Sequence, residues 1–170
     1  MTQPIYAIYS TNGCGRGVMP LARRQLQQLD VSLDRLVIVD DNLREEVVNG
    51  HRVLTYSEFS ETEASEHRVV IAIANSAVRK KMAVRCVNDG LKFWSVKAFN
   101  TVIMDDVRIG EGAIMNPFVT LTSNIKIGQH FHANINSYVE HDCVIGDYVT
   151  FAPAVKCNGN VVIEDHAYIG

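Results

Sequence analysis

The sequence predicts two successive domains of different architecture, a parallel α/β domain over residues 1–96 and a parallel β-helix over residues 97–170. The first half alternates short apolar segments with segments of helical character, which indicates strands joined by helices in a parallel sheet. In the second half an apolar residue recurs at every sixth position, and Gly110, Gly128 and Gly146 recur at 18-residue spacing. A period of six fits neither an α-helix nor a hairpin sheet. It is typical of hexapeptide repeats, three of which form one triangular coil.

Three strands and two helices are expected in the first half. The strands are expected at residues 5–10, 35–41 and 67–74, where the segments IYAIYS, RLVIVDD and HRVVIAIA lie. A helix is expected over residues 18–29, with Pro20 near its start, where a missing N–H costs least. The second helix is expected over residues 77–89, with Ser76 as its N-cap and Gly90 at its end. The apolar residues expected on one face of this helix are Val78, Met82, Cys86 and Val87.

The hexapeptide repeat also assigns a direction to each side chain in the second half. Every sixth residue from Ile103 to Ile169 is apolar, and the residues four positions after each of these are small or apolar. We expect both sets to point into the β-helix. The third position of each hexapeptide lies at a corner and points outward, and one corner carries Ser123, His141 and Gly159 in successive coils. His141 and Gly159 should therefore be stacked neighbours, about 5 Å apart along the axis.

The composition argues against several classes of protein. The chain has 170 residues, 47% of them hydrophobic, which suits one large domain or two small ones. A formal net charge of −3 provides no basic field of the kind that nucleic-acid binding needs. No apolar run is long enough for a transmembrane helix, so membrane insertion is not expected, and the first residues lack a signal-peptide pattern. The four cysteines are scattered without a C-x-x-C pair, so we expect a reduced, cytoplasmic protein.

The pairing of His141 with Gly159 suits acyl transfer. An imidazole can accept the proton of an attacking nucleophile, and a free glycine N–H can stabilise the oxyanion that develops on a carbonyl. Glycine also leaves room for a thioester, and Asp142 can orient the imidazole and stabilise its protonated form. The alternative is that Glu140, His141 and Asp142 are solvated residues at a β-helix corner, and the repeat alone does not decide between the two.

The first half carries a candidate nucleotide site. The segment GCGRG, which contains Gly13 and Gly15, lies between a strand and a helix, where backbone N–H groups can hold a phosphate. Asp40 and Asp41 end the next strand and can bind ribose hydroxyls. The glycines also fit a simple tight turn, and the combined pattern also fits NAD. A dehydrogenase would need a catalytic domain, however, and a β-helix follows instead.

The segment EHDCVIGDYVTFAPAVKCNGNVVIEDHAYIG, residues 140–170, resembles the signature of the sialic-acid O-acetyltransferase-like sugar acyltransferases. This family includes bacterial UDP-amino-sugar N-acetyltransferases of the PglD type. The segments YSTNGCGRGV and AIANSAVRKKM also resemble motifs of the family, so the resemblance covers essentially the whole chain. It implies that the first domain is Rossmann-like and that the β-helix is left-handed.

The resemblance implies roles for individual residues. It implies that His141 is the general base, with Asp142 as its acidic neighbour, and that the amide of Gly159 faces the thioester. Asn134, seven residues before the histidine, matches an asparagine of the same family site. The residues implied to bind a nucleotide-linked sugar are Gly13, Gly15, Asp40, Asp41, Ala74 and Asn75.

The expected reaction is acetyl transfer from acetyl-CoA to the amino group of a UDP- or dTDP-linked sugar. Acetyl-CoA is then a co-substrate, and neither a tightly bound cofactor nor a metal is expected. Asn134 and His141 fall near different corners of one coil, so they can share a site only across a subunit contact, which predicts a homotrimer.

Three alternative functions remain open from the sequence. The same chemistry could act on a sugar hydroxyl, and the chain could be a non-catalytic nucleotide-sugar binder. A zinc enzyme with a β-helix is the third, but His130, His132 and His141 lack the spacing typical of that class.

The sequence departs from the family pattern at three places. Ser10 stands where the glycine-rich loop has its first glycine, and Thr150 stands where a second histidine is frequent. Family members also continue with further coils that hold acetyl-CoA, whereas this sequence stops at Gly170. From this stop we expect weak binding of acetyl-CoA and a mobile last coil.

Overall fold

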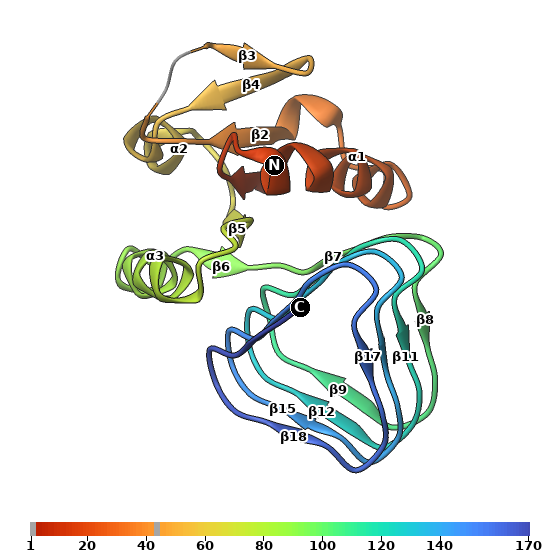
Figure 1. Cartoon of the computed structure of the whole chain (residues 1–170). Coiled ribbons are helices and arrows are strands. Elements are labelled where there is room, and N and C mark those ends of the chain that lie inside the picture. The colour runs from red at the N-terminus through yellow and green to blue at the C-terminus, as the bar shows by residue number, and fades with distance from the viewer. Residues whose placement is uncertain (1–2, 43–44) are drawn as a thin grey trace.

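The computed structural model describes residues 3–42 and 45–170, and it contains a sheet with flanking helices followed by a triangular β-helix (Figure 1). The sheet has the order β3-β4-β2-β1-β5-β6, and every pair is parallel except β3 with β4. Its strands are β1 (Ile5–Tyr9), β2 (Leu36–Val39), β3 (Val47–Val48), β4 (His51–Leu54), β5 (His67–Ile71) and β6 (Lys92–Phe93). The helices are α1 (Gly13–Gln27), the short 3-10 helix η1 (Leu33–Arg35), α2 (Tyr56–Glu61) and α3 (Ser76–Asn88). The parallel sheet predicted from strand–helix alternation is thus present.

The start of α1 differs from the expected one. The helix begins at Gly13, so the glycine-rich segment forms its first turns and does not precede it as a loop. Pro20 consequently lies inside the helix, and its expected place near the start is wrong. The expectation failed because the helix was placed where the apolar residues begin, five residues too late.

The N-cap of α3 is also one residue earlier than expected. Asn75, and not Ser76, is the cap, because its Oδ1 accepts a hydrogen bond from the backbone N–H of Val78 at 3.0 Å. The end of the helix was predicted correctly, since Gly90 follows it with a φ of +76°.

The buried face of α3 matches the expected apolar one only in part, because Cys86 is buried and Met82 packs partly buried against the core as expected. Val78 and Val87 are 44% and 60% exposed, and the residues of α3 that are buried are Arg79, Ala83 and Cys86. These three follow the helical spacing of four and three residues, so the helix is amphipathic with a charged residue on its buried side. A face predicted from apolar residues alone was therefore rotated away from the true one.

The β-helix follows the hexapeptide repeat closely. Its strands form three parallel sheets, β19-β16-β13-β10-β7, β17-β14-β11-β8 and β18-β15-β12-β9, and each strand pairs with the one 18 residues further along. The strands are β7 (Val96–Lys97), β8 (Val102–Ile103), β9 (Val107–Ile109), β10 (Ile114–Met115), β11 (Thr120–Leu121), β12 (Ile125–Ile127), β13 (His132–Ala133), β14 (Tyr138–Val139), β15 (Val144–Ile145), β16 (Thr150–Phe151), β17 (Lys156–Cys157), β18 (Val162–Ile163) and β19 (Tyr168–Ile169). Both sets of residues expected to point inward form its core.

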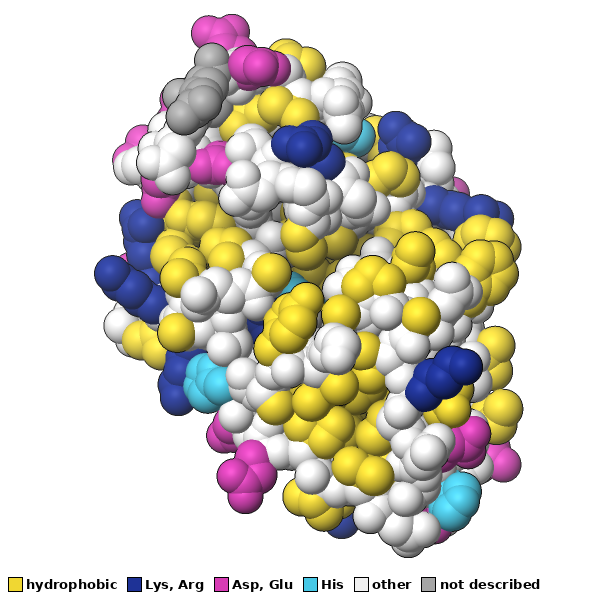
Figure 2. All heavy atoms as spheres, viewed as in Figure 1, with side chains coloured by type: hydrophobic (Ala, Val, Ile, Leu, Met, Phe, Trp, Pro, Cys, Tyr) yellow, Lys and Arg dark blue, Asp and Glu magenta, His cyan; other side chains and the backbone are white. Residues whose placement is uncertain are grey.

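Packing in this core is tightest in the middle coils. The inward residues of the first and last coils are only half-buried, including Ile103, Val107, Ile163 and Ile169. Figure 2 shows hydrophobic side chains gathered over the β-helix on the face viewed. No helix in residues 3–42 and 45–170 combines the length and the apolar character needed to cross a membrane.

Each corner of the β-helix contains a residue with a left-handed backbone conformation. At one corner these residues recur once per coil, with φ between +51° and +60°, at Asp106, Asn124, Asp142 and Asn160. Asparagine, aspartate and glycine adopt this conformation at the lowest cost, which explains the residue types at this corner.

The sheet-bearing part and the β-helix meet at α3 and the corner between β15 and β16. The guanidinium of Arg79 is fully buried there and donates hydrogen bonds to the carbonyl oxygens of Ile73, Ala74 and Tyr148 and to Thr150 Oγ1. All four acceptors lie within 3.0 Å. Arg79 therefore connects the two parts.

An aromatic stack lines the same junction. The rings of His130 and Tyr148 are parallel with centroids 5.0 Å apart, and the ring of His166 stacks on Tyr148 at 5.2 Å. Phe93 of β6 meets the His130 ring edge-on at 4.5 Å. The three stacked residues occupy the same position in successive coils. The 18-residue register of the β-helix therefore aligns the rings that face the sheet-bearing part of the chain.

Candidate active site

The corner between β14 and β15 places His141 against Gly159. Any Cβ at Gly159 would lie 2.7 Å from His141 Cε1 and 2.8 Å from Nε2, so only glycine leaves room for the imidazole here. The backbone holds the two coils in register, because the N–H of Asn160 donates to the carbonyl of His141 at 2.9 Å. The His141 side chain is 54% exposed and open to a substrate. The stacking predicted from the repeat is thus observed.

Asp142 makes a direct hydrogen bond with the imidazole. The distance between Asp142 Oδ2 and His141 Nδ1 is 2.8 Å. Hydrogen bonds from His141 and from Asn124 Nδ2 lower the pKa of Asp142, so this carboxyl is ionised at neutral pH. An ionised carboxylate only accepts hydrogen bonds, so Nδ1 carries the proton. The lone pair is therefore on Nε2, the ring nitrogen beside Gly159.

Asn124 is a polar neighbour of this site that the sequence reasoning missed. Its side chain donates to Asp142 Oδ1 at 3.2 Å. The signal that could have found it is its place 18 residues before Asp142, one coil earlier at the same corner.

The Gly159 amide remains available for a ligand. Among the described residues, its N–H has no hydrogen-bond acceptor. A backbone N–H can donate a hydrogen bond to a carbonyl oxygen, and an imidazole lone pair beside it can accept the proton of a nucleophile that attacks the same carbonyl.

Asn134 lies at a different corner, between β13 and β14. Its Nδ2 donates to the carbonyl of Phe151 at 2.9 Å, and Asn116 Nδ2 approaches its Oδ1 at 3.5 Å. Strand β14 separates it from His141, so a single chain does not bring these two predicted site residues together.

An open pocket of about 970 Å³ lies at the carboxyl ends of β1, β2 and β5. Of the residues expected at the nucleotide site, Asp40 and Asp41 line this pocket. The others are absent from its lining among the residues that the structure describes; they are Gly13, Gly15, Ala74 and Asn75. The pocket also includes Arg16, whose Nη1 donates to the carbonyl of Thr11 at 2.8 Å.

The two carboxylates of this pocket are already engaged in hydrogen bonds. Burial alone would raise the pKa of Asp40, but hydrogen bonds from the hydroxyl and N–H of Thr11 and the N–H of Asn42 outweigh it and lower that pKa. For Asp41 burial is likewise outweighed, by donors from Tyr56, Tyr9 and Arg85, and the pKa is lowered. Both are therefore ionised at neutral pH.

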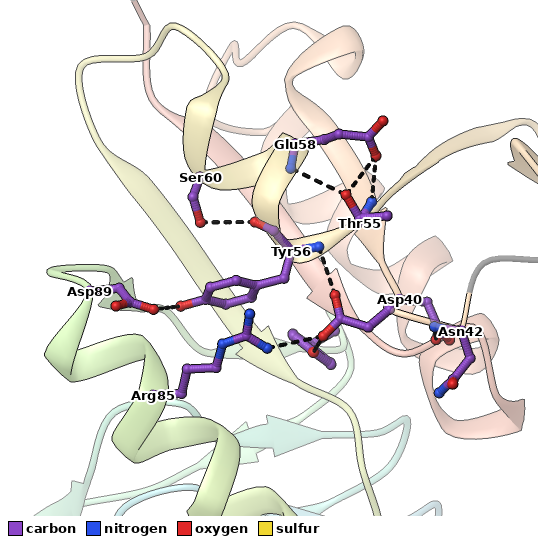
Figure 3. Close-up of polar contacts among 10 residues, drawn as sticks. Asp40, Asn42, Thr55, Tyr56, Glu58, Ser60, Arg85 and Asp89 are labelled. Carbon is purple, nitrogen blue, oxygen red and sulfur yellow. Dashed lines mark hydrogen bonds and ion pairs between the residues drawn. The ribbon is translucent and has the colours of Figure 1, made fainter.

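Figure 3 shows how α2 and α3 surround this end of the sheet. The Tyr56 hydroxyl donates a hydrogen bond to Asp89 Oδ2 at 2.7 Å. Arg85 Nη1, on α3, donates to Asp41 Oδ2 at 3.0 Å. Asp41 therefore links strand β2 to both helices, whereas Asp40 links the end of β2 to the loop between β1 and α1 through Thr11.

The glycine-rich segment has a structural explanation that the sequence reasoning did not anticipate. A Cβ at Gly15 would overlap the carbonyl of Ser10, so the close packing of β1 on α1 requires glycine there. Gly13 has open space around its Cα. Ser10 itself has a φ of +116°, a conformation that suits glycine, which accounts for the glycine of related loops at this place.

Three further positions considered from the sequence lie at the domain junction and not at the His141 corner. Thr150 is buried against Arg79, so the structure gives it no path to the site. His130, at the corner before β13, and His132, on β13, are buried at this junction too, whereas His141 follows β14 at a different corner. Three histidines that a shared zinc ion would need are therefore spread over two corners.

Comparisons with known proteins agree with this arrangement. No family model matches the chain. It is 45% identical to GDP-perosamine N-acetyltransferase of Escherichia coli O157:H7 over 166 residues, which is 98% of this chain and 75% of that protein. WeeI from Acinetobacter baumannii AYE shares its structure with a TM-score of 0.94 and 52% identity, over 98% of this chain and 77% of that chain. A mutant perosamine N-acetyltransferase from Caulobacter crescentus, solved with CoA and GDP-perosamine, has a TM-score of 0.82 at 21% identity, over 96% and 76% of the two chains.

The similarity to the first two proteins extends through both parts of the chain. The resemblance to sugar acyltransferases in the segment of residues 140–170 is confirmed by them. The chain belongs to the hexapeptide-repeat sugar N-acetyltransferases, the family of GDP-perosamine N-acetyltransferase, and it is an acetyltransferase.

Proposed function

We propose that this protein transfers the acetyl group of acetyl-CoA to the amino group of a nucleotide-linked sugar. The observation that carries the proposal is the position of the Nε2 lone pair of His141 beside the free N–H of Gly159. The 45% identical relative is named an N-acetyltransferase of GDP-perosamine, which is a nucleotide amino sugar. Acetyl-CoA acts as a co-substrate that leaves as CoA after each turnover.

The chemistry assigns one step to each group of the corner. The amine nitrogen attacks the thioester carbonyl, and His141 Nε2 accepts the proton that the nitrogen loses. The N–H of Gly159 stabilises the negative charge on the carbonyl oxygen of the tetrahedral intermediate. When the intermediate collapses, the C–S bond breaks and the proton on His141 passes to the departing CoA sulfur. Asp142 stabilises the imidazolium between these two proton transfers.

We place the nucleotide in the pocket of about 970 Å³, in a Rossmann-like domain over residues 1–96, with acyl transfer in residues 97–170. Asp40 accepts hydrogen bonds from ribose hydroxyls or base, and the N-terminus of α1, opened by Gly13, faces the phosphates. Gly15 acts by allowing β1 to pack on α1, and Asp41 by fixing the helices around the pocket. Ala74 and Asn75, at the start of α3, complete the far side of the site.

We also propose a homotrimer, in which Asn134 of one subunit meets His141 of the next. The corner of Asn134 carries exposed apolar side chains, and the most exposed are Phe99 and Phe118, at 64% and 62%. Apolar side chains of this size on neighbouring coils suit a subunit contact, and threefold symmetry closes such contacts without an open end. Light scattering should give three chains per particle, and Phe118→Glu should shift the particle toward monomer. A monomeric native chain would contradict the trimer.

Transfer assays test the reaction. The chain is incubated with acetyl-CoA and amino sugars linked to GDP, UDP or dTDP, and CoA release and product mass are measured against the corresponding hydroxy sugars. We expect acetylation of an amino sugar, with the GDP-linked one favoured by the named relative. Transfer to hydroxy sugars alone would replace the proposal by O-acetylation, and nucleotide-sugar binding without transfer would leave only a binding protein.

The four cysteines are free, which supports a cytoplasmic location, where this donor and a reducing environment coexist.

A further inference from the structure

The Asp142 carboxylate is held from two sides, and its second partner has no role in the mechanism above. Oδ2 pairs with His141 Nδ1 at 2.8 Å, and Oδ1 accepts a hydrogen bond from Asn124 Nδ2 at 3.2 Å. The backbone keeps these groups in register, because the N–H of Asp142 donates to the carbonyl of Ser123 at 3.0 Å. Asn124, Asp142 and His141 therefore form one hydrogen-bonded chain across two coils.

This chain matters because the pair it supports is exposed. The side chains of His141 and Asp142 are 54% and 49% exposed, and a single hydrogen bond between solvated side chains restrains them weakly. A donor on the other carboxylate oxygen restricts rotation of the Asp142 side chain. The fixed carboxylate continues to accept the hydrogen bond from Nδ1–H, so the proton stays on Nδ1 and the Nε2 lone pair stays directed toward Gly159.

The backbone does not explain why asparagine occupies position 124. Asp106, Asn124, Asp142 and Asn160 share the left-handed conformation at successive levels of this corner, with φ between +51° and +60°. Aspartate and asparagine both tolerate that conformation, and the corner alternates between them. Only the asparagine amide can donate a hydrogen bond to an ionised Asp142, whereas an aspartate at 124 would repel it. The side chain, and not the backbone, thus distinguishes the two residues here.

We propose that Asn124 is a positioning residue for acetyl transfer, which holds the Asp142 carboxylate so that His141 keeps Nδ1 protonated and Nε2 free for the substrate amine. The proposal rests on the proposed function, in which His141 is the base. Asn124 itself acts through Asp142 and does not touch the reacting atoms.

Two substitutions and one control test the role of Asn124. Asn124→Gly keeps the left-handed backbone and removes the donor, and Asn124→Asp keeps the shape and replaces the donor with a charge. Asp106→Gly changes a residue of the same conformation at the same corner, one coil further from Asp142, and serves as the matched control. For each protein, kcat and both KM values are measured from pH 5 to 9, and the ¹⁵N shifts of the His141 ring are recorded by NMR in the same samples.

We expect Asn124→Gly to lower kcat by about 3- to 10-fold, the share of one hydrogen bond to a charged but exposed group, with both KM values unchanged. Asn124→Asp removes the donor and places a like charge beside the ionised Asp142, so it should lower kcat at least as much as Asn124→Gly does. The His141 ring should be a single Nδ1–H tautomer in the native protein and the control, and a mixture in Asn124→Gly.

The outcomes separate this proposal from the proposed function. A native tautomer and a native kcat in Asn124→Gly, in a protein whose His141→Ala variant is inactive, would overturn the role of Asn124 alone. Full transfer activity in His141→Ala would overturn the proposed mechanism. The ring shifts do not depend on turnover, so a tautomer mixture in Asn124→Gly that is absent from the native protein and the Asp106→Gly control would still support the positioning of the ring.

Discussion

Arg79 Nη2 on α3 donates a hydrogen bond to Thr150 Oγ1 on β16 at 2.9 Å, and the same nitrogen donates to the carbonyl of Tyr148 at 2.6 Å. These two bonds cross from the sheet-bearing part of the chain to the β-helix. Burial lowers the pKa of Arg79 to about 10, so it remains protonated at neutral pH. The placement of the sheet-bearing part on the β-helix therefore depends on a buried cation, whose acceptors among the described residues are three carbonyls and one hydroxyl.

Replacement of Arg79 should weaken the whole fold. Arg79→Met fills similar space but leaves three carbonyls and one hydroxyl without their donor, so we expect the free energy of unfolding to fall by about 2–4 kcal/mol. Urea denaturation measures this change. The control is Lys81→Ala on the exposed side of the same helix, which should stay within about 0.5 kcal/mol of the native value. Equal stability of the two variants would show that the junction does not need the cation.

The same junction should make stability depend on pH. Burial, together with the charge of Arg79 and against the weaker pull of Asp147, lowers the pKa of His130 from 6.5 to about 4. The folded state therefore resists protonation, and stability is fully present above pH 6.5 and is lost as the pH falls toward 4, at up to about 1.4 kcal/mol per pH unit. Burial lowers the pKa of His132 too, so it contributes in the same direction.

His130→Asn tests this dependence, because asparagine suits the φ of +53° and does not titrate. Denaturation at pH 7.5 and pH 5 should show that the free energy of unfolding falls less in the variant than in the native protein. His132 and His51, whose pKa values burial also lowers, contribute to the remaining fall. If the native protein has the same free energy of unfolding at pH 7.5 and pH 5, the buried histidines do not make its stability depend on pH.

The general base is tested by His141→Ala. This change should lower kcat by roughly two to four orders of magnitude, the usual contribution of a base, and leave nucleotide-sugar affinity nearly unchanged. Steady-state kinetics give the first quantity and calorimetry the second. Unchanged turnover would return His141 to the class of solvated corner residues.

The two glycines of the α1 segment should behave differently. A Cβ at Gly15 overlaps the Ser10 carbonyl, so Gly15→Ala should lower both stability and sugar affinity, by about 1–3 kcal/mol in stability. A Cβ at Gly13 has nothing within 4 Å, so Gly13→Ala should preserve the fold. If a phosphate binds against the backbone there, the added methyl group should raise the KM for the sugar substrate. Melting curves and kinetics on both variants separate the two roles, and an equally stable Gly15→Ala would contradict the packing argument.

Gly159→Ala tests the contact on which the proposed chemistry depends. The methyl group would lie within 2.8 Å of His141 Nε2 and Cε1, and the imidazole would have to rotate away. We expect kcat to fall by at least about tenfold, since loss of base alignment acts in the transition state, with a melting temperature close to native. Gly17→Ala, which meets nothing within 4 Å, is the matched control and should keep full activity.

The β-helix could be predicted from the sequence residue by residue, whereas the junction could not. In the β-helix the register of 18 residues places Leu121 beside Val139 whatever the rest of the chain does, so the period alone determines the core. Burial of Arg79 depends on carbonyls contributed from two parts of the fold, and a pattern of apolar residues on α3 carries no trace of them. For this reason the predicted face was right for Cys86 and Met82 but wrong for Val78 and Val87.

Some missed features were readable. Thr55 and Glu58 form a capping box at the start of α2, where Glu58 Oε2 accepts from the N–H of Thr55 at 2.7 Å and Thr55 Oγ1 accepts from the N–H of Glu58 at 3.2 Å (Figure 3). The spacing of threonine and glutamate is visible in the sequence, yet α2 was not predicted. At the candidate site the repeat did place His141 beside Gly159, but the way in which Asp40 and Asp41 are already hydrogen-bonded depends on loops that follow no period.

The register of the β-helix also restricts how the length of this protein can change over evolution. A duplication or loss of 18 residues before His141 adds or removes one whole coil and returns every later side chain to its own face. A change of six residues keeps the inward pattern intact and would pass unnoticed in a hydrophobicity profile, yet it turns everything downstream by one face of the triangle. His141 and Gly159 would still meet, but on a side of the prism that no longer has the same relation to the nucleotide pocket. Viable lineages should therefore differ here in steps of complete coils.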